Sequence, residues 1–425
     1  MCPVTAQTDA RPAIEAVWRI ESARLIAGLA RMVHDVGLAE ELAQDALVSA
    51  LEQWPETGVP KNPGAWLMAV AKRRAIDGFR RRENLDRKLV ELGRDLETSP
   101  QPSEDDIAEA LDDQIGDDLL RLVFTSCHPV LSTEARVALT LRLLGGLTTD
   151  EIARAFLVPE STVAQRIVRA KRTLAKKKVP FEVPEGEELA TRLGDVLEVV
   201  YLIFNEGYSA TAGQDWVRPS LCAEALRLGR VLAELAPKEP EVHGLVALME
   251  IQASRLRARI GPDGEPVLLL DQNRGRWDQL LIRRGLAALR RAEATGVPVG
   301  SYTLQAAIAA CHARARTAEE TDWDQIAALY AVLARLSPSP VVELNRAVAV
   351  SMARGPAAGL ELVDSLAGDP AMAKYHLLPS VRGDLLAKLG RTAEARAEFE
   401  RAAELTRNER ERALLLDRAE NAVHS

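Results

Sequence analysis

The sequence is poor in aromatic residues and in cysteine. Phe, Trp and Tyr together make up 4% of the 425 residues, and the four cysteines lie far apart, at Cys2, Cys127, Cys222 and Cys311. Because no two of them form a C-x-x-C pair, a redox motif or a cysteine-based metal site is unsupported, and reduced thiols are the simplest interpretation. His128 follows Cys127 but has no partner motif, so we expect this pair at a helix end before Pro129.

Long apolar runs are also missing, as is the basic and then apolar stretch that begins a secretory signal. A membrane-spanning helix needs roughly 18–20 apolar residues, so we expect neither a signal peptide nor a membrane span, and we expect a cytoplasmic protein. Apolar and polar residues rarely alternate as they do in strands, while Ala, Leu, Arg and Glu dominate. This composition predicts an all-α protein, and 425 residues suffice for two or three domains.

The formal net charge of -8 excludes a protein coated in basic surface for non-specific nucleic-acid binding. Any contact with DNA must therefore come from local cationic patches. Two such patches occur, at residues 72–82 and 166–178, and an acidic tract at residues 97–118 lies between them. The two signs of charge are thus segregated along the chain.

Residues 144–178 contain two predicted helices separated by a sharp turn. Thr148 or Thr149 can cap the first helix, which carries Ile152, Ala153 and Phe156, before a Val-Pro step ends it. The second helix has one apolar stripe, which we expect to face the first helix, formed by Val163, Ile167, Ala170 and Leu174.

The opposite face of this second helix is polar and cationic. It carries Ser161, Gln165, Arg169, Arg172 and Lys176, with Arg166 and Lys171 on its flanks. A helix of this kind can enter the major groove of DNA, so the pair predicts a helix-turn-helix with a recognition face. An ordinary helical hairpin with a solvated basic side would show the same pattern.

Residues 11–54 predict two amphipathic helices. The second buries Leu38, Leu42 and Ala46, with Ala50 and Leu51 at its side. We expect its acidic and amide side chains to point outward together: Glu40, Glu41, Gln44 and Asp45. Such a cluster is usually only solvated, but its position before a basic segment favours a protein contact.

A proline-rich loop and a basic helix follow. Pro55, Gly58 and Pro60 predict a rigid loop, and Pro63 suits the first turn of a helix over residues 64–82. We expect four side chains of this helix to pack inward: Trp66, Val70, Ile76 and Phe79. Its cationic edge consists of Lys72, Arg73, Arg74, Arg80, Arg81 and Arg82. This composition suits a phosphate backbone with unstacked bases, although a basic helix end is more often merely solvated.

These motifs, in this order and spacing, resemble a bacterial RNA polymerase sigma factor of the extracytoplasmic-function (ECF) type, reduced to its regions 2 and 4. AEELAQDALVSAL at residues 39–51 resembles the region 2.2 helix, which in the family docks on the β′ clamp. KNPGAWLMAVAKRRAIDGFRRR at residues 61–82 resembles regions 2.3 and 2.4, which melt and read the minus-10 element. The helix-turn-helix resembles region 4.2, which reads the minus-35 element, and region 4 also meets the β flap.

The resemblance implies three sets of contact residues and no catalytic residue, metal or cofactor. The set for core polymerase is Asp35, Glu40, Glu41, Gln44 and Asp45. The set for minus-10 DNA is Asn62, Trp66, Lys72, Arg73, Asp77, Arg80 and Arg81. The set for minus-35 DNA is Ser161, Thr162, Gln165, Arg166, Arg169, Lys171 and Arg172. The sequence departs from the family's common pattern at Leu47 and at Ala164-Gln165, so its base preference does not transfer from other members.

The chain therefore divides into four expected segments. Region 2 covers residues 11–83, an acidic linker covers residues 84–116, and region 4 covers residues 117–178. A helical domain covers residues 187–425. In its last part, Gly355 and Gly390 begin similar segments about 35 residues apart, close to the tetratricopeptide period of 34. Residues 187–425 resemble the tetratricopeptide-like extension of one ECF subgroup, which implies regulation by the fused domain, through an intramolecular or peptide contact.

Two patches in this C-terminal half are unusually polar: FNEGY at residues 204–208 and LLLDQNRGRWD at residues 268–278. Their polar residues are Asn205, Glu206, Asp271, Gln272, Arg274, Arg276 and Asp278. A ligand pocket or an enzyme site is one interpretation, with Glu206 or Asp271 as a general acid or base. A buried polar network with loop caps is the favoured one.

A one-component regulator that binds operator DNA without polymerase, and senses a ligand or peptide through its C-terminal half, is the alternative function. The NPGAW segment at residues 62–66 speaks against it, because a repressor needs no strand-melting region. The promoter sequence, the inducing signal and the oligomeric state are not determined by this sequence.

Overall fold

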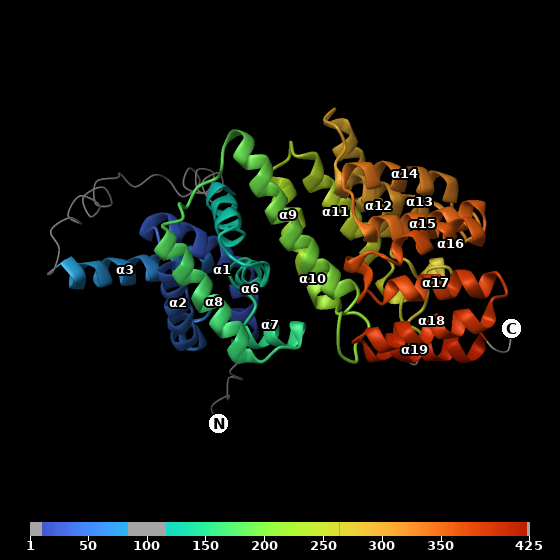
Figure 1. Cartoon of the computed structure of the whole chain (residues 1–425). Helices are drawn as coiled ribbons and strands as arrows, with labels where there is room; N and C mark the ends of the chain where they lie inside the picture. The colour runs from blue at the N-terminus through green and yellow to red at the C-terminus, as the bar shows by residue number, and fades with distance from the viewer. Residues whose placement is uncertain (1–10, 84–115, 263, 423–425) are drawn as a thin grey trace, which may run out of the picture. The chain divides into compact units, whose positions relative to one another are not determined.

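The computed structural model describes residues 11–83, 116–262 and 264–422, with the side chains of residues 78–83 left aside. Within those ranges every regular element is a helix, and the only strand-like pairings are two isolated bridges. The all-α prediction is confirmed. The chain forms two compact units, Met1–Val199 and Val200–Ser425. Figure 1 labels the helices of both. The expected acidic linker at residues 84–116 lies, but for its last residue, outside the described residues.

The first unit begins with a bundle of three helices, α1 (Arg11–Val33), α2 (Val36–Thr57) and α3 (Pro63–Glu83). Its core contains Leu29, Trp54 and Leu67, which are each at most 1% exposed. Pro55 lies inside the last turn of α2 and not in the following loop, so the helix ends later than expected, at Gly58 with a φ of 81°. Leu51, expected at the buried side, is 42% exposed.

The rest of the first unit contains a helix at residues 116–126, then α6 (Thr133–Leu143), α7 (Thr149–Phe156) and α8 (Glu160–Lys177). Thr148 caps α7 in a capping box with Glu151. Leu157 then adopts a left-handed conformation and ends the helix. The buried residues of α8 are the four of the expected stripe: Val163, Ile167, Ala170 and Leu174. The helix-turn-helix prediction is therefore confirmed as a structure.

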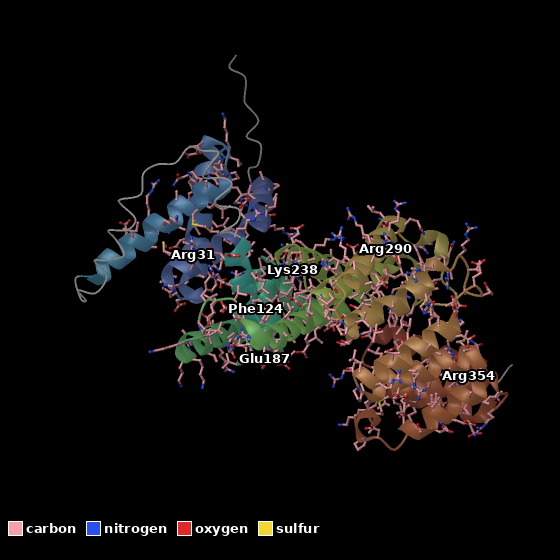
Figure 2. All side chains as sticks on the ribbon, turned by 90° about the horizontal axis from the view of Figure 1, so that it is seen from above. Arg31, Phe124, Glu187, Lys238, Arg290 and Arg354 are labelled. Atoms are coloured by element: carbon pink, nitrogen blue, oxygen red, sulfur yellow. The ribbon has the colours of Figure 1, made fainter. Side chains whose placement is uncertain are left out.

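Helix α9 (Gly186–Tyr208) runs through the division between the units. Its first part is held to the α6 region, because Arg136 pairs with Asp195 at 2.9 Å and Arg192 donates to the carbonyl of Phe124 at 2.8 Å. Phe124, labelled in Figure 2, is 1% exposed. Residues 187–199 thus belong structurally to the first unit, although the expected domain boundary lay before them.

The second unit begins with the end of α9 and with α10 (Pro219–Leu235), α11 (Pro240–Ala253), α12 (Gln279–Ala294) and α13 (Ser301–Arg314). Helix α11 is buried on nearly all sides and packs against its three neighbours. Glu241 at its start caps α13, since its carboxylate accepts bonds from the backbone N–H groups of Gly300, Tyr302 and Thr303. Two short 3-10 turns, η2 (Leu256–Ala258) and η3 (Arg274–Arg276), connect α11 to α12.

The second unit continues as a run of antiparallel helices. These are α14 (Trp323–Leu336), α15 (Pro340–Arg354), α16 (Pro356–Leu366), the short η4 (Pro370–Met372), α17 (Leu377–Lys388), α18 (Thr392–Leu405) and α19 (Glu409–Asn421). Each of the six long helices packs on the next. Gly355 and Gly390, with φ of 96° and 74°, form equivalent turns after α15 and α17. These stacked hairpins are compatible with the expected repeat.

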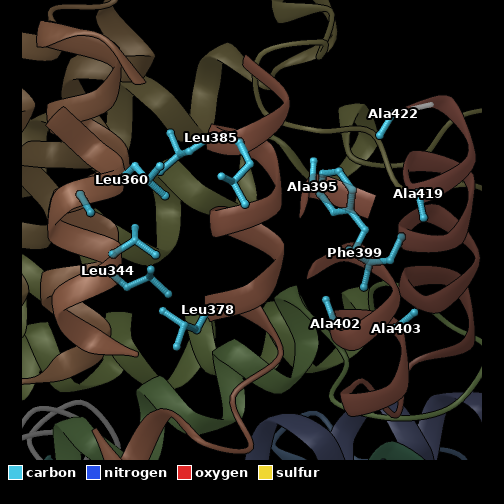
Figure 3. Packing of buried hydrophobic residues seen from close by; sticks show 14 of the residues in the cluster. Leu344, Leu360, Leu378, Leu385, Ala395, Phe399, Ala402, Ala403, Ala419 and Ala422 are labelled. Atoms are coloured by element: carbon cyan, nitrogen blue, oxygen red, sulfur yellow. The ribbon is translucent and has the colours of Figure 1, made fainter. Parts of the chain in front are cut away.

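The core of these repeats is aliphatic, with one large ring, as Figure 3 shows. Phe399 of α18 is 1% exposed and faces α17. A Cβ atom at Gly383 of α17 would lie 2.9 Å from this ring, closer than real Cβ atoms come. A small residue is therefore required there for the two helices to approach.

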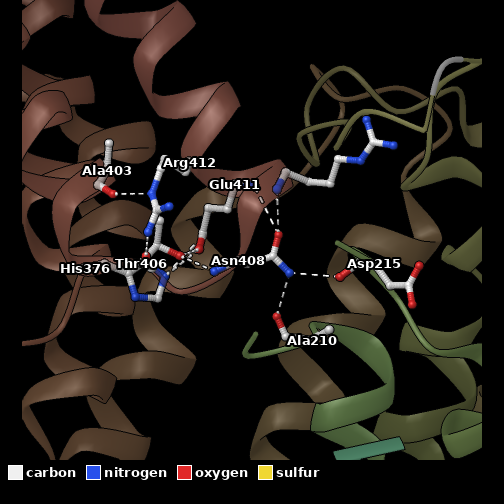
Figure 4. A network of polar contacts seen from close by, with 9 residues as sticks. Ala210, Asp215, His376, Ala403, Thr406, Asn408, Glu411 and Arg412 are labelled. Carbon is white, nitrogen blue, oxygen red and sulfur yellow. Dashed lines mark hydrogen bonds and ion pairs between the residues drawn. The ribbon is translucent and has the colours of Figure 1, made fainter. Parts of the chain in front are cut away.

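Asn408 connects the end of the repeats to the start of the unit (Figure 4). Its amide donates to the carbonyls of Ala210 at 3.0 Å and Asp215 at 2.8 Å, and its Oδ1 caps α19 through the N–H groups of Arg410 and Glu411. The residue is 1% exposed. All four hydrogen-bonding possibilities of this amide are used, so it joins segments some two hundred positions apart.

Replacing Asn408 with alanine should lower the free energy of unfolding by about 2–4 kcal/mol, because two buried carbonyls and a helix start lose their partner. Chemical denaturation of the full chain measures this. Asn273→Ala is the control, since Asn273 caps only the short exposed η3 turn. Equal effects of the two changes would contradict the assigned role.

Candidate nucleic-acid interface

The polar face of α8 is open to solvent. Ser161, Gln165, Arg169 and Arg172 are all exposed, and Thr162 and Arg166 are half-buried at its flanks. Within the described residues, neither Arg169 nor Arg172 forms an ion pair. These side chains stand opposite the apolar stripe that fixes α8 to α6 and α7. The helix can therefore present hydrogen-bonding and cationic groups to a duplex without disturbing its own packing.

Lys171 differs from the rest of the expected minus-35 set. It is half-buried and forms an ion pair with Glu40 of α2. Its ammonium group is thus directed at a carboxylate of the N-terminal bundle and away from the open face of α8. In this arrangement Lys171 has no charge available for a DNA phosphate.

Glu40 is the clearest correction to the expected polymerase-binding face. It was expected to point outward, but it is 3% exposed. Besides Lys171, its carboxylate accepts bonds from Gln44 at 2.6 Å and from Nε of Arg142 at 2.7 Å. The reason is its place on α2, because Val36, Ala39 and Ala43 are buried and residues at i, i+3, i+4 and i+7 share one helix face.

The other members of that face have different surroundings. Asp35 caps α2 by accepting from the backbone N–H of Leu38 at 3.0 Å. Glu41 is exposed, Gln44 is half-buried, and Asp45 pairs with Arg74 of α3 at 3.1 Å. The expected cluster is therefore divided between a helix cap, a buried ion-pair network and an exposed edge.

The contact between α2 and α8 is not tightly filled. A cavity of about 490 Å³ lies beside it, lined by residues from the start of α2 and the end of α8, among them Asp35, Lys171, Leu174 and Phe181. A second, of about 400 Å³, is lined by Glu41, Val168 and Arg172. The ion pair between Glu40 and Lys171 thus lies in a contact that is bordered by two cavities.

The expected minus-10 set lies on α3 and its start. Asn62 caps α3 by accepting from the N–H of Ala65 at 3.0 Å. Trp66 is half-buried and its ring meets that of Trp54 edge-on, with centroids 5.2 Å apart. Lys72, Arg73 and Asp77 are exposed. The side chains of Arg80 and Arg81 lie outside the described residues.

Cys127 and His128 lie at a helix end, as expected. Burial raises the pKa of the Cys127 thiol to about 11, and its sulfur lies 3.4 Å from the hydroxyl of Thr140. His128 accepts a bond from the backbone N–H of Val130. This thiol is therefore not an activated nucleophile. In the described parts of the chain, no group of three or more His, Cys, Asp or Glu side chains is arranged to hold a metal.

The two polar patches of the C-terminal half are mainly structural. Glu206 pairs with Arg218 and accepts from the hydroxyl of Thr211, while Asp278 caps α12. Arg274 donates to the carbonyls of His312 and Ala315 and to the hydroxyl of Thr321. The favoured interpretation, a polar network with loop caps, fits these residues. None of the described helices combines the length and apolarity of a membrane span.

Models of known families match three separate segments of the chain. Residues 20–84 match sigma-70 region 2, and residues 121–174 match sigma-70 region 4. Residues 192–293 match a family described as of unknown function, DUF6596. No solved structure matches the chain.

Three relatives illustrate the range of similarity. "Uncharacterized protein R00370" of Rhizobium meliloti (strain 1021) is 45% identical over 388 residues, 91% of this chain and 90% of that protein. The ECF RNA polymerase sigma factor SigK of Mycobacterium tuberculosis (strain ATCC 25618 / H37Rv) is 29% identical over 145 residues, 34% of this chain and 74% of SigK. The probable ECF sigma factor SigI of strain CDC 1551 / Oshkosh is 27% identical over 182 residues, 42% of this chain and 60% of SigI.

The two sigma-70 matches coincide with the N-terminal bundle and with the helix-turn-helix whose open face has just been described, and the DUF6596 match begins in α9. The chain belongs to the extracytoplasmic-function sigma factors of bacterial RNA polymerase and carries an additional C-terminal domain.

Proposed function

We propose that the open face of α8 reads the minus-35 element of this sigma factor's promoters. Ser161, Gln165 and Arg169 contact base edges, and Arg166 and Arg172 hold phosphates on either side. The observation that carries this proposal is the separation of the two faces of α8: the buried stripe fixes the helix, and the exposed cations have no protein partner within the described residues.

The N-terminal bundle contributes the second DNA contact and the polymerase contact. Trp66, positioned by the ring of Trp54, and the exposed Lys72 and Arg73 of α3 engage the melted minus-10 strand. Glu41 and Asp45 form the accessible part of the surface for core polymerase.

Use of both surfaces at once requires that the contact between α2 and α8 opens. Glu40, assigned to polymerase, and Lys171, assigned to a phosphate, are each other's partners in the closed arrangement. Because neither can serve two partners, polymerase and promoter compete with this ion pair. The structure described here is then the resting form of the first unit, and engagement exchanges internal ion pairs for external ones.

The C-terminal domain regulates the sigma regions through α9. The first part of α9 packs on the helix-turn-helix domain, where Arg136, 10% exposed in its side chain, pairs with Asp195. A conformational change in the second unit can therefore reach the domain that contains α8, because α9 is one continuous helix that extends into both units.

Arg169→Ala should weaken promoter binding by about 1–3 kcal/mol and relax base preference at one position of the minus-35 element, because a bidentate contact to a base edge is lost. Run-off transcription with core enzyme and a promoter library measures both. Arg290→Ala is the control, since Arg290 is exposed on α12 of the other unit. Unchanged preference in Arg169→Ala would contradict the placement of α8.

Arg142→Gln should tighten binding of core polymerase roughly tenfold, because one charged hydrogen bond to Glu40 is removed from the closed form while every proposed external contact remains. Hydrogen exchange around Glu40 should rise at the same time. Arg154→Gln, which removes only a surface pair within α7, is the control. Equal affinity and equal exchange in the two variants would show that the contact is not a barrier to binding.

Truncation after Val199 should change transcription by core enzyme in a purified system, upward if the domain is a brake and downward if it is a support. The cut keeps Arg192, Asp195 and Glu198, which hold α9 to the first unit. A cut before residue 187 would remove these contacts and is the comparison. Activity equal to that of the full chain would contradict a regulatory role.

A further inference from the structure

A cluster of arginines and aromatic rings lies where α11 ends, in the second unit. Arg255 follows α11 after one residue, and Arg259 closes the η2 turn. Arg274 begins η3 in the following loop. These three arginines belong to none of the surfaces proposed for DNA or polymerase. The sequence analysis named Arg274 but neither Arg255 nor Arg259.

The three guanidinium groups share aromatic rings. The guanidinium carbon of Arg259 lies 3.9 Å from the ring centroid of Tyr208 and 5.3 Å from that of Trp216. That of Arg255 lies 5.7 Å from both Tyr208 and Trp277, and that of Arg274 lies 5.0 Å from Trp277. Arg255 is thus the central cation, because it shares the ring of Tyr208 with Arg259 and the ring of Trp277 with Arg274.

The three arginines differ in how well their charge is matched. Arg274 is satisfied by two carbonyls and a hydroxyl. Arg255 is only 9% exposed, yet no described residue accepts a hydrogen bond from its side chain or pairs with its charge. Arg259 likewise forms no ion pair with a described carboxylate, and the Nε atoms of both are buried without a partner. A buried cation without a counter-charge is costly. Among the described residues Arg255 has no such counter-charge, and the half-buried Arg259 has only a hydrogen bond to Tyr208.

Two neutral hydrogen-bond donors also lie on the aromatic residues that contact these arginines. The indole N–H groups of Trp216 and Trp277 are buried without an acceptor. Unmatched groups in proteins are few, and four unmatched donors, two of them cationic, lie on residues that share aromatic contacts. A group that accepts several hydrogen bonds and carries negative charge would satisfy them together.

The neighbouring groups respond to this excess of positive charge. Burial, together with the charges of Arg255 and Arg274, lowers the pKa of His312 to about 3, so this imidazole is neutral and adds no charge. Burial lowers the pKa of Arg259, and the charge of Arg255 acts in the same direction, although Tyr208 partly opposes it. The positive charge of this cluster is therefore carried by the three arginines alone.

We propose that Arg255 and Arg259 bind a phosphate group, either free phosphate or a small phosphate monoester, with Trp216 and Trp277 as further donors. The guanidinium fork matches the spacing of phosphate oxygens, and a group with nearly two negative charges near pH 7 balances two cations. The C-terminal domain is then a binding domain for a ligand that carries a phosphate group.

Isothermal titration of the full chain with inorganic phosphate and with phenyl phosphate tests this, in potassium chloride of matched ionic strength. Both probes should bind, and phosphate should raise the unfolding temperature beyond the chloride control. Tighter binding of phenyl phosphate would identify a monoester as the ligand, and equal or weaker binding would identify free phosphate. If neither probe gave a heat of binding, the proposal would be overturned, whatever the variants showed.

The variants Arg255→Gln and Arg259→Gln should each lower phosphate affinity roughly tenfold or more. Without phosphate, Arg255→Gln should unfold at the same or a higher temperature than the natural chain, because an unmatched buried cation is removed. Arg257→Gln is the control, since Arg257 lies between them and is exposed. Phosphate affinity unchanged in both variants, or lost equally in Arg257→Gln, would contradict the site.

Discussion

The buried carboxylate of Glu40 determines how the sigma regions of this protein are arranged. It lies on the face of α2 that packs inward, and it is matched there by Arg142 and Lys171 from the α6 and α8 helices. Removing one partner of such a group leaves an unmatched charge, whereas exchanging partners preserves the balance. In the proposed function, the same carboxylate holds the regions together in the free chain and contacts polymerase in the bound one. Two cavities border this contact.

The second unit contains two kinds of buried polar group: the side chain of Asn408, whose hydrogen bonds are all formed, and the donors around Arg255, which lack partners among the described residues. Around Asn408 every donor and acceptor of the amide is used, and the result is a rigid connection between its first loop and its last helix. The buried carboxylate of Glu411 beside it is also hydrogen-bonded. Burial would raise its pKa, but hydrogen bonds from His376 and Thr406 outweigh burial and lower it. Around Arg255, in contrast, several donors have no partner among the described residues, and we propose that a ligand supplies it.

The helical repeats and the proposed phosphate site suggest how the additional domain would act. Its repeats form a stable stack, its phosphate site lies at the end of α11, and α9 continues from this unit into contacts with the helix-turn-helix domain. A ligand that matches the charge of Arg255 and Arg259 would stabilise one form of the unit over others.

Local periodicity was enough to predict the helices and the helix-turn-helix, because it specifies which face of a helix is apolar. The order and spacing of three motifs pointed to the family. Val163, Ile167, Ala170 and Leu174 had to be buried in any fold that used this helix, and the basic face opposite them had to be open. The sequence could not place Glu40, whose acidic neighbours suggested a solvated face, nor find Arg255 and Arg259, which belong to no motif. Those positions were decided by tertiary structure alone, because the surroundings of a charge depend on segments far away in the chain: Arg142 and Lys171 for Glu40, and Tyr208, Trp216 and Trp277 for the two arginines.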